Sequence, residues 1–291
     1  MILKFLRTGA RPFTFAYPLP LLSIVAYSIA KSSAWDAFLS YIFCFLFFTA
    51  ANLWNHINDA EDDLKAGRAE SAFLLENRSY GVAVVVSFYL LAFLLAFFGT
   101  KDREVAVVAF FIASLFTWLY SDKIYLGRFF RRFKEDYRTE VLTYVFCTIS
   151  FPLLVWTFFS ELSLTGLAFS ASMGVMYFSG FILKDLKDIS ADSEAGYNTL
   201  GVVFPPSLLL KLSVGLFLVS VCIITIASIL GAFPKASILI STIFVVLGLL
   251  IYLFNKESWK ITPKLVRPLK IYTNTYLIVL LLLGMVSFFN L

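Results

Sequence analysis

The first segment that could do chemistry is NLWNHINDAEDD, at residues 52–63. It follows a long apolar run and places Asn55, Asp59 and Asp63 at intervals of four residues. Residues spaced in this way lie along one face of a helix. The segment therefore predicts a stripe of one amide and two carboxylates.

A second acidic segment, KDLKDISADSEAG, occupies residues 184–196. Asp188 and Asp192 repeat the four-residue interval, and Asp185 precedes them by about one turn. Taken alone, either segment would fit a solvated acidic loop as well as it fits a functional site. Two such segments, both with helical spacing, favour a shared site.

Two facing stripes of carboxylates near lipid would repel one another strongly unless cations bind there. Oxygen ligands suit Mg²⁺, which takes one or two carboxylates and completes its shell with water and substrate phosphate. We therefore expect Mg²⁺ and a diphosphate to bind between the segments. An EF-hand is excluded, because Leu64 stands where that loop needs a glycine.

Basic residues near the acids could bind such a diphosphate. Lys123 ends the segment WLYSDK, which also contains Tyr120, and Lys184 begins the second acidic segment. A cation there could stabilise the charge of a leaving group, although lysines also mark a membrane edge by snorkelling. Asn58 is a further candidate for binding the diphosphate. For the run Arg128, Arg131 and Arg132, we expect contact with anionic lipid instead.

The elements that must position these residues are membrane-spanning helices. The chain of 291 residues is 60% hydrophobic and only 15% charged, whereas soluble domains average about 25% charged residues. Segments of about 20 apolar residues predict helices that cross the membrane. The sequence predicts an all-α polytopic bundle, a single domain over residues 1–291, with nine spans at 13–30, 37–57, 80–99, 105–122, 141–159, 164–183, 206–231, 235–254 and 271–289.

The basic residues predict the orientation of these spans. All but four of the 24 Lys and Arg residues fall at the N-terminus or in the loops on its side of the membrane; the exceptions are Lys31, Lys101, Arg103 and Lys235. Positive loops stay in the cytoplasm. We therefore expect a cytoplasmic N-terminus, with both acidic segments on the cytoplasmic face.

The pairing of NHINDAEDD with DLKDISADSEAG, followed by AGYNTL, resembles the UbiA superfamily of intramembrane prenyltransferases. The likeness extends over the whole chain, including the number of spans and the place of both motifs. It implies a helical bundle around a central cavity open to lipid, and Mg²⁺-dependent transfer of an isoprenyl group from an isoprenyl diphosphate, such as geranylgeranyl diphosphate, to an acceptor.

The resemblance also implies roles for individual residues. The expected metal ligands are Asn55, Asp59, Asp63, Asp185, Asp188 and Asp192. The expected catalytic residues are Asp59, Asp63, Asp188, Asp192 and Tyr120, and those expected to bind the diphosphate are Asn55, Asn58, Lys123 and Lys184. Tyr120 and Lys123 stand where the family has a Tyr-x3-Lys pair, but here only two residues separate them.

The acceptor is the open part of this interpretation. Several UbiA subfamilies carry an Asn-Arg-Pro type sequence after the first motif, whereas this chain reads LKAGRAESAFL. An aromatic acceptor, as in quinone biosynthesis, is the preferred expectation. A chlorophyll-like ring and a glycerophosphate lipid precursor are the alternatives. Aromatic side chains could stabilise an allylic cation, and Tyr120, Tyr144 and Tyr177 are the candidates.

An ion-coupled secondary transporter is the rival from another class, since intramembrane carboxylates are common in transporters. Transporter sites, however, lie near the bilayer midplane in broken helices, and these acids gather at one interface. An alcohol phosphotransferase would pack its acids into one contiguous motif. This chain separates them into two distant segments.

Overall fold

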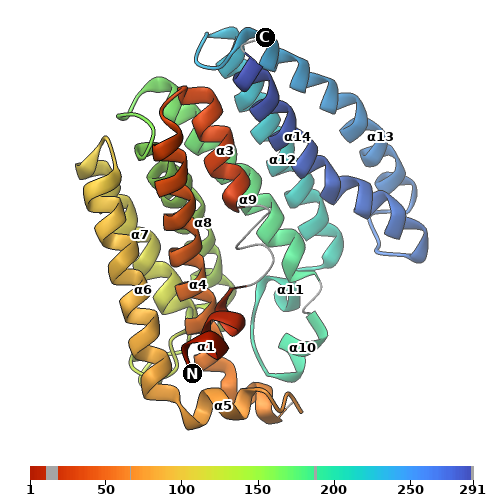
Figure 1. Cartoon of the computed structure of the whole chain (residues 1–291). Coiled ribbons are helices and arrows are strands. Elements are labelled where there is room, and N and C mark those ends of the chain that lie inside the picture. The colour runs from red at the N-terminus through yellow and green to blue at the C-terminus, as the bar shows by residue number, and fades with distance from the viewer. Residues whose placement is uncertain (11–18, 66, 187–188, 290–291) are drawn as a thin grey trace.

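The computed structural model describes residues 1–10, 19–65, 67–186 and 189–289 (Figure 1). Within these ranges eight helices are long and apolar enough to cross a membrane, and the shorter apolar α3 (Leu19–Ala30) precedes them. The long helices are α4 (Ala34–Lys65), α6 (Arg78–Gly99), α7 (Arg103–Ser121), α8 (Tyr137–Thr157), α9 (Leu164–Asp185), α12 (Pro206–Ile229), α13 (Ile243–Lys256) with the preceding η3 (Lys235–Thr242), and α14 (Val266–Phe289).

Helices overlap each of the nine predicted spans, and the prediction of an all-α polytopic membrane bundle is confirmed. The first predicted span is covered by α3 from residue 19, and its earlier part lies outside the described residues. Short helices join the spans. They are α1 (Ile2–Gly9), α5 (Ser71–Glu76), η1 (Leu126–Arg128), η2 (Phe133–Glu135), α10 (Ile189–Glu194), α11 (Leu200–Val203) and η4 (Pro263–Leu265).

Polar residues set where several spans begin. The side chain of Asp102 accepts a hydrogen bond from Val105 N at the start of α7, and Ser163 accepts one from Gly166 N at the start of α9. Such caps satisfy backbone N–H groups that the first helical turn leaves without a partner. The residue at which each of these helices begins is therefore determined by its neighbours in the sequence.

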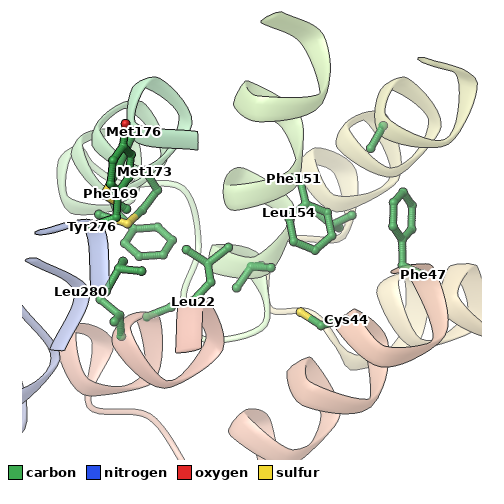
Figure 2. Close-up of a cluster of buried hydrophobic side chains, with 14 of the residues drawn as sticks. Leu22, Cys44, Phe47, Phe151, Leu154, Phe169, Met173, Met176, Tyr276 and Leu280 are labelled. Atoms are coloured by element: carbon green, nitrogen blue, oxygen red, sulfur yellow. The ribbon is translucent and has the colours of Figure 1, made fainter. Parts of the chain in front are cut away.

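Figure 2 shows the apolar core that holds the bundle together. Leu22 of α3, Cys44 of α4, Leu154 of α8, Met173 of α9 and Leu280 of α14 are all fully buried. Helices far apart in the sequence thus share one cluster of side chains. Lipid is as apolar as these residues, so dense packing rather than removal from water stabilises the contacts.

Buried hydroxyl groups join α9, α12 and α14. Ser213 Oγ donates to Ser179 O over 2.9 Å and lies 2.9 Å from Tyr272 Oη. Tyr272 Oη in turn lies 2.8 Å from Tyr276 Oη. Hydrogen bonds of this kind hold helices together where no water can compete.

The chain brings its chemistry-bearing segments to one end of the bundle. Figure 1 shows the N-terminus, α5 and α10 at the same end, whereas α14 finishes at the opposite end. The C-terminal part of α4 and the C-terminal end of α9 point toward α5 and α10 (Figure 1). Both acidic segments therefore lie at the N-terminal end of the molecule.

Candidate active site

The first acidic segment is helical, because α4 continues for 32 residues to Lys65. Asn55 and Asp59 are one turn apart and share a single cation. Lys134 Nζ lies 2.6 Å from each carboxylate oxygen of Asp59 and 3.1 Å from Asn55 Oδ1. Ser121 Oγ also donates to Asn55 Oδ1 over 2.6 Å. Residues of α4, α7 and η2 thus meet at one point.

Arg132 is the second cation on Asp59 and is almost completely buried, with 3% of its side chain exposed. Its Nη1 lies 2.7 Å from Asp59 Oδ1, its Nη2 donates to Tyr197 Oη over 2.6 Å, and its Nε binds Glu135. The expected contact of Arg132 with anionic lipid is wrong. A guanidinium offers five donors in a fixed plane, and here they satisfy three partners inside the protein.

The environment shifts the pKa of both cations. Burial lowers the pKa of the Lys134 ammonium, although the charge of Asp59 opposes the change. For Arg132, burial also opposes the charged form, but the hydrogen bond to Glu135 and the charge of Asp59 together raise the pKa. Burial thus disfavours the charged form of both side chains, and contact with acids opposes this effect in each case.

The next acids of α4 pair with separate bases. Asp62 accepts two hydrogen bonds of 3.1 Å from Lys123 Nζ, and Asp63 binds the largely exposed Arg68 at 2.8 Å. An α-helix turns about 100° per residue, so Asp62 lies within about 20° of Asn55, whereas Asp63 lies about 80° away. Asp62 therefore shares the ion-pair cluster of Asp59, and Asp63 is offset from it.

Asn58 and Lys123 connect α4 to the end of α7. The buried Asn58 accepts a hydrogen bond of 2.7 Å from Lys123 N through Oδ1 and donates to Trp54 O over 2.8 Å through Nδ2. The amide of Asn58 thus fixes the backbone of Lys123, while the Lys123 ammonium reaches Asp62 and Glu61.

The second acidic segment is divided between two helices. Asp185 ends α9, Asp192 lies on α10, and Asp188 lies outside the described residues. Asp185 and Asp192 do not share one helical stripe, because α9 ends at Asp185 with Leu186 as its C-cap and Asp192 lies on the separate α10. Lys184 is exposed at the end of α9.

The acids of this segment have partners of their own. Tyr144 Oη hydrogen-bonds both Asp185 Oδ1, at 2.9 Å, and Glu140 Oε1, at 3.0 Å. Thr199 Oγ1 donates to Asp192 Oδ2 over 2.9 Å. The ring of Tyr120 lies 6.3 Å from that of Tyr144. Tyr120 and Tyr144 thus stand on the side of Asp185.

The segment before α8 joins the two acidic segments. Asn198 N donates to Glu135 O over 2.9 Å, and Tyr137 N donates to Asn198 O over 2.8 Å. Arg132 adds its hydrogen bond to Tyr197. Residues 132–137 therefore contact Asp59 on one side and the loop after Asp192 on the other.

The oxygen atoms of Asn55 and Asp59 form one candidate half of a metal site. Among the described residues, which omit Asp188, no group of three His, Cys, Asp or Glu side chains is placed to hold a metal ion. Asn55 Oδ1 and the Asp59 carboxylate nevertheless converge on one cation, Lys134 Nζ. These oxygens are the ligand type that Mg²⁺ prefers, so the pair fits one side of a magnesium site.

Sequence reasoning missed Lys134 and Glu140. Both are charged residues close to α8, and no spacing relates them to either acidic motif. The available signal was a buried charge: Glu140 falls near the start of an apolar span, and charges there need partners. The sequence alone does not say which partner each one has.

One hollow lies between two of the spans, and another lies beside Arg132. A hollow of about 410 Å³ lies between α4 and α6 and is lined by apolar residues that include Ile42, Leu91 and Phe98. A smaller one of about 80 Å³ lies beside Arg132 and Asp122. At the end of α4, Lys134 contacts Asn55 and Arg132 contacts Asp59 directly.

No protein-family model matches the chain. A protein of Archaeoglobus fulgidus with no characterised function is 51% identical to it over 277 residues, covering 95% of this chain and 96% of that protein. The two proteins belong to one family.

Solved structures share the fold at low identity. A structure of digeranylgeranylglyceryl phosphate synthase has a TM-score of 0.75 at 16% identity and covers 99% of this chain and 98% of its own. A UbiA homologue from Archaeoglobus fulgidus bound to DMAPP and Mg²⁺ has a TM-score of 0.67 at 17% identity, with 99% of each chain covered. A UbiA homologue from Aeropyrum pernix has a TM-score of 0.60 at 15% identity, with 92% and 94% covered.

Proposed function

Since the chain has the fold of the UbiA superfamily, we propose that it transfers an isoprenyl group from an isoprenyl diphosphate to a lipophilic acceptor within the membrane, with Mg²⁺ as the cofactor. UbiA homologues of this fold bind DMAPP or GPP together with Mg²⁺. In the proposed reaction the allylic C–O bond breaks and its electron pair leaves with pyrophosphate. A new bond joins the isoprenyl carbon to the acceptor, which loses a proton.

One observation carries the proposal: Asn55, Asp59, Lys134 and Arg132 converge at the end of the bundle where both acidic segments lie. The oxygens of Asn55 and Asp59 would hold Mg²⁺, and the two cations would face the diphosphate. A magnesium ion bound there would neutralise the negative charge that develops on the departing pyrophosphate.

The other proposed residues act around this point. Asp188, Asp192 and Asp185 would bind metal from the second segment, and Asp63 from the first. Lys123, whose backbone Asn58 holds, and Lys184 would bind the diphosphate. Tyr120 would face the reacting carbon, because its ring lies beside that of Tyr144 on the side of Asp185.

The acceptor has two candidates. An aromatic acceptor follows from the resemblance to quinone-forming members of the superfamily. A glycerophosphate lipid is favoured by the fold similarity to digeranylgeranylglyceryl phosphate synthase, whose TM-score of 0.75 exceeds the 0.67 of the DMAPP-bound homologue. A fold shared at 16% identity does not distinguish the two acceptor classes. The following experiment is designed to distinguish them.

The test is pyrophosphate release from geranylgeranyl diphosphate by purified protein, with and without Mg²⁺. The acceptor panel contains 4-hydroxybenzoate, other aromatic acids and geranylgeranylglyceryl phosphate. We expect release that needs Mg²⁺ and one class of acceptor, which would identify the acceptor at the same time. Absence of pyrophosphate release with every acceptor, and of Mg²⁺-dependent diphosphate binding, would favour the transporter.

Asp59→Asn is the matched variant for this assay. It keeps the shape of the side chain but removes the charge that Lys134 and Arg132 now neutralise. We expect turnover to fall by at least about 100-fold, the typical loss when one electrostatic contact to a transition state is removed. Turnover at the wild-type rate in a folded variant would contradict the assigned role of Asp59.

A further inference from the structure

We propose that Lys134 is an internal cation that occupies the metal position between Asn55 and Asp59 and leaves it only when a diphosphate is present. Metal binding to the free protein is then weak, and the diphosphate makes it strong. This inference rests on the proposed function, because it concerns how the same site selects its ligands.

The contacts of Lys134 are those of a competitor for metal. Its Nζ touches both oxygens of Asp59 at 2.6 Å and Asn55 Oδ1 at 3.1 Å. These atoms are the ones a divalent cation would need on this side of the site. An ammonium and a metal ion cannot use them together, so one must leave before the other binds.

Lys134 can move without unfolding its surroundings. The backbone around it is fixed: Thr139 Oγ1 donates to Phe133 O over 2.7 Å, and Asn198 N donates to Glu135 O over 2.9 Å. The ammonium, however, sits at the end of a flexible four-carbon stem. Rotation of the side chain alone would carry Nζ from the carboxylate to a nearby phosphate oxygen.

Arg132 is the contrasting residue, because it cannot leave as easily. Its guanidinium binds Asp59, Glu135 and Tyr197 at once. Moving Arg132 would break its contacts with all three partners. Moving Lys134 would break only its contacts with Asn55 and Asp59 and leave their oxygens open to a metal ion. The structure therefore assigns the exchange to Lys134 and a fixed supporting role to Arg132.

The charges of the cluster explain why a diphosphate is needed. Four acids and four bases pair here, so the cluster is neutral as it stands; they are Asp59, Glu61, Asp62 and Glu135 with Arg78, Lys123, Arg132 and Lys134. A metal ion alone would add two positive charges to a partly buried neutral site, which is unfavourable. A diphosphate supplies the compensating negative charge and a new partner for Lys134.

The exchange couples the two ligands thermodynamically. If diphosphate draws Lys134 away and so strengthens metal binding, metal must strengthen diphosphate binding by the same factor. Removing the ammonium should raise the affinity for metal alone and shrink this factor. A lysine that only holds the fold together would have neither effect.

The experiment measures Mn²⁺ binding by electron paramagnetic resonance, in purified wild-type protein and in Lys134→Gln. Each is titrated with and without geranyl S-thiolodiphosphate, an unreactive analogue of an isoprenyl diphosphate. We expect K134Q to bind Mn²⁺ alone about tenfold more tightly than wild type, within the usual range of coupling between sites. We also expect the analogue to enhance Mn²⁺ affinity less in K134Q than in wild type.

Arg78→Gln is the control for a general change of charge. It removes the same positive charge from the same cluster, but Arg78 contacts Glu61, and Lys134 stays on Asn55 and Asp59 in this variant. Its Mn²⁺ affinity should change less than about threefold, since partly exposed charges are screened. The double variant Asp59→Asn/Lys134→Gln should not show the higher Mn²⁺ affinity of K134Q, because it lacks the Asp59 carboxylate. Lys134→Met is a second variant without the ammonium, and it should show the same higher affinity even if Gln perturbs the fold.

Three results would overturn the inference, and they differ in what they say of the proposed function. Equal Mn²⁺ affinities in wild type, K134Q and K134M, with enhancement by the analogue in all three, would reject the role of Lys134 and leave the proposed function standing. Absence of Mn²⁺ binding in every protein, even with the analogue, would reject both. An equal gain in Mn²⁺ affinity in R78Q would show a general effect of charge and so reject a specific exchange by Lys134.

Discussion

At the scale of single residues, Arg132 joins parts of the chain that the sequence keeps far apart. Its guanidinium contacts Asp59 on α4, Glu135 on η2 and Tyr197 after α10. Asp59 belongs to the first acidic segment, and Tyr197 directly follows the second. One side chain thus sets the distance between the segments before any ligand binds.

We expect Arg132→Gln to lower the free energy of unfolding by about 3 kcal/mol, because Glu135 loses the cation that it contacts and Asp59 keeps only Lys134. Stability would be measured by thermal and denaturant unfolding in detergent. The control is Arg68→Gln, whose guanidinium is 61% exposed in its ion pair with Asp63. Exposed pairs contribute less than about 1 kcal/mol, so equal losses in the two variants would contradict the bridging role of Arg132.

At the scale of elements, α8 and α9 approach so closely that their contact depends on a glycine. A Cβ atom at Gly174 of α9 would lie 2.5 Å from the backbone oxygen of Thr148 on α8. Small residues at such positions let helix backbones meet in lipid. This contact positions Tyr144 and Glu140 of α8 opposite Asp185 of α9.

Gly174→Ala should therefore separate α8 from α9 and lower the free energy of unfolding by about 1–3 kcal/mol, the usual cost of overpacking. The matched control is Gly215→Ala in α12, where an added Cβ would meet nothing within 4 Å. That change should stay within about 1 kcal/mol. Similar melting temperatures for G174A and wild type would show that the helices can move apart freely.

At the scale of the whole molecule, the position of the charges predicts how the protein sits in the membrane. The four Lys and Arg residues expected on the far side include Lys101, which pairs with Asp36 at 3.0 Å, and Lys235. The acidic segments and the N-terminus lie at the opposite end from the end of α14 (Figure 1). Both segments should therefore face the cytoplasm.

Reporter fusions test this orientation. A fluorescent reporter that folds only in the cytoplasm should be active at the N-terminus and after residue 260, and inactive at the C-terminus. The expectation follows from the retention of positively charged loops in the cytoplasm. Activity at the C-terminal fusion would reverse the orientation and place the site on the other face.

The sequence by itself determined the spans, their type and the end of the bundle at which the acids gather. Each of these depends on properties of one continuous segment: about 20 apolar residues make a span, and an even number of crossings returns the chain to the same side. Asp102 and Ser163 show the same locality, because each caps the helix that follows it directly.

Only the tertiary structure decided which charge pairs with which. Lys134 and Arg132 follow α7 as Lys123 does, yet two of them bind Asp59 and the third binds Asp62. The four-residue interval from Asn55 selects Asp63, yet Asp62 rather than Asp63 joins the ion-pair cluster of Asp59. Pairing depends on contacts between segments more than 60 residues apart, which spacing along the chain does not encode. For this reason the predicted metal ligands could be named from the sequence, whereas the cation that lies on Asn55 and Asp59 could not.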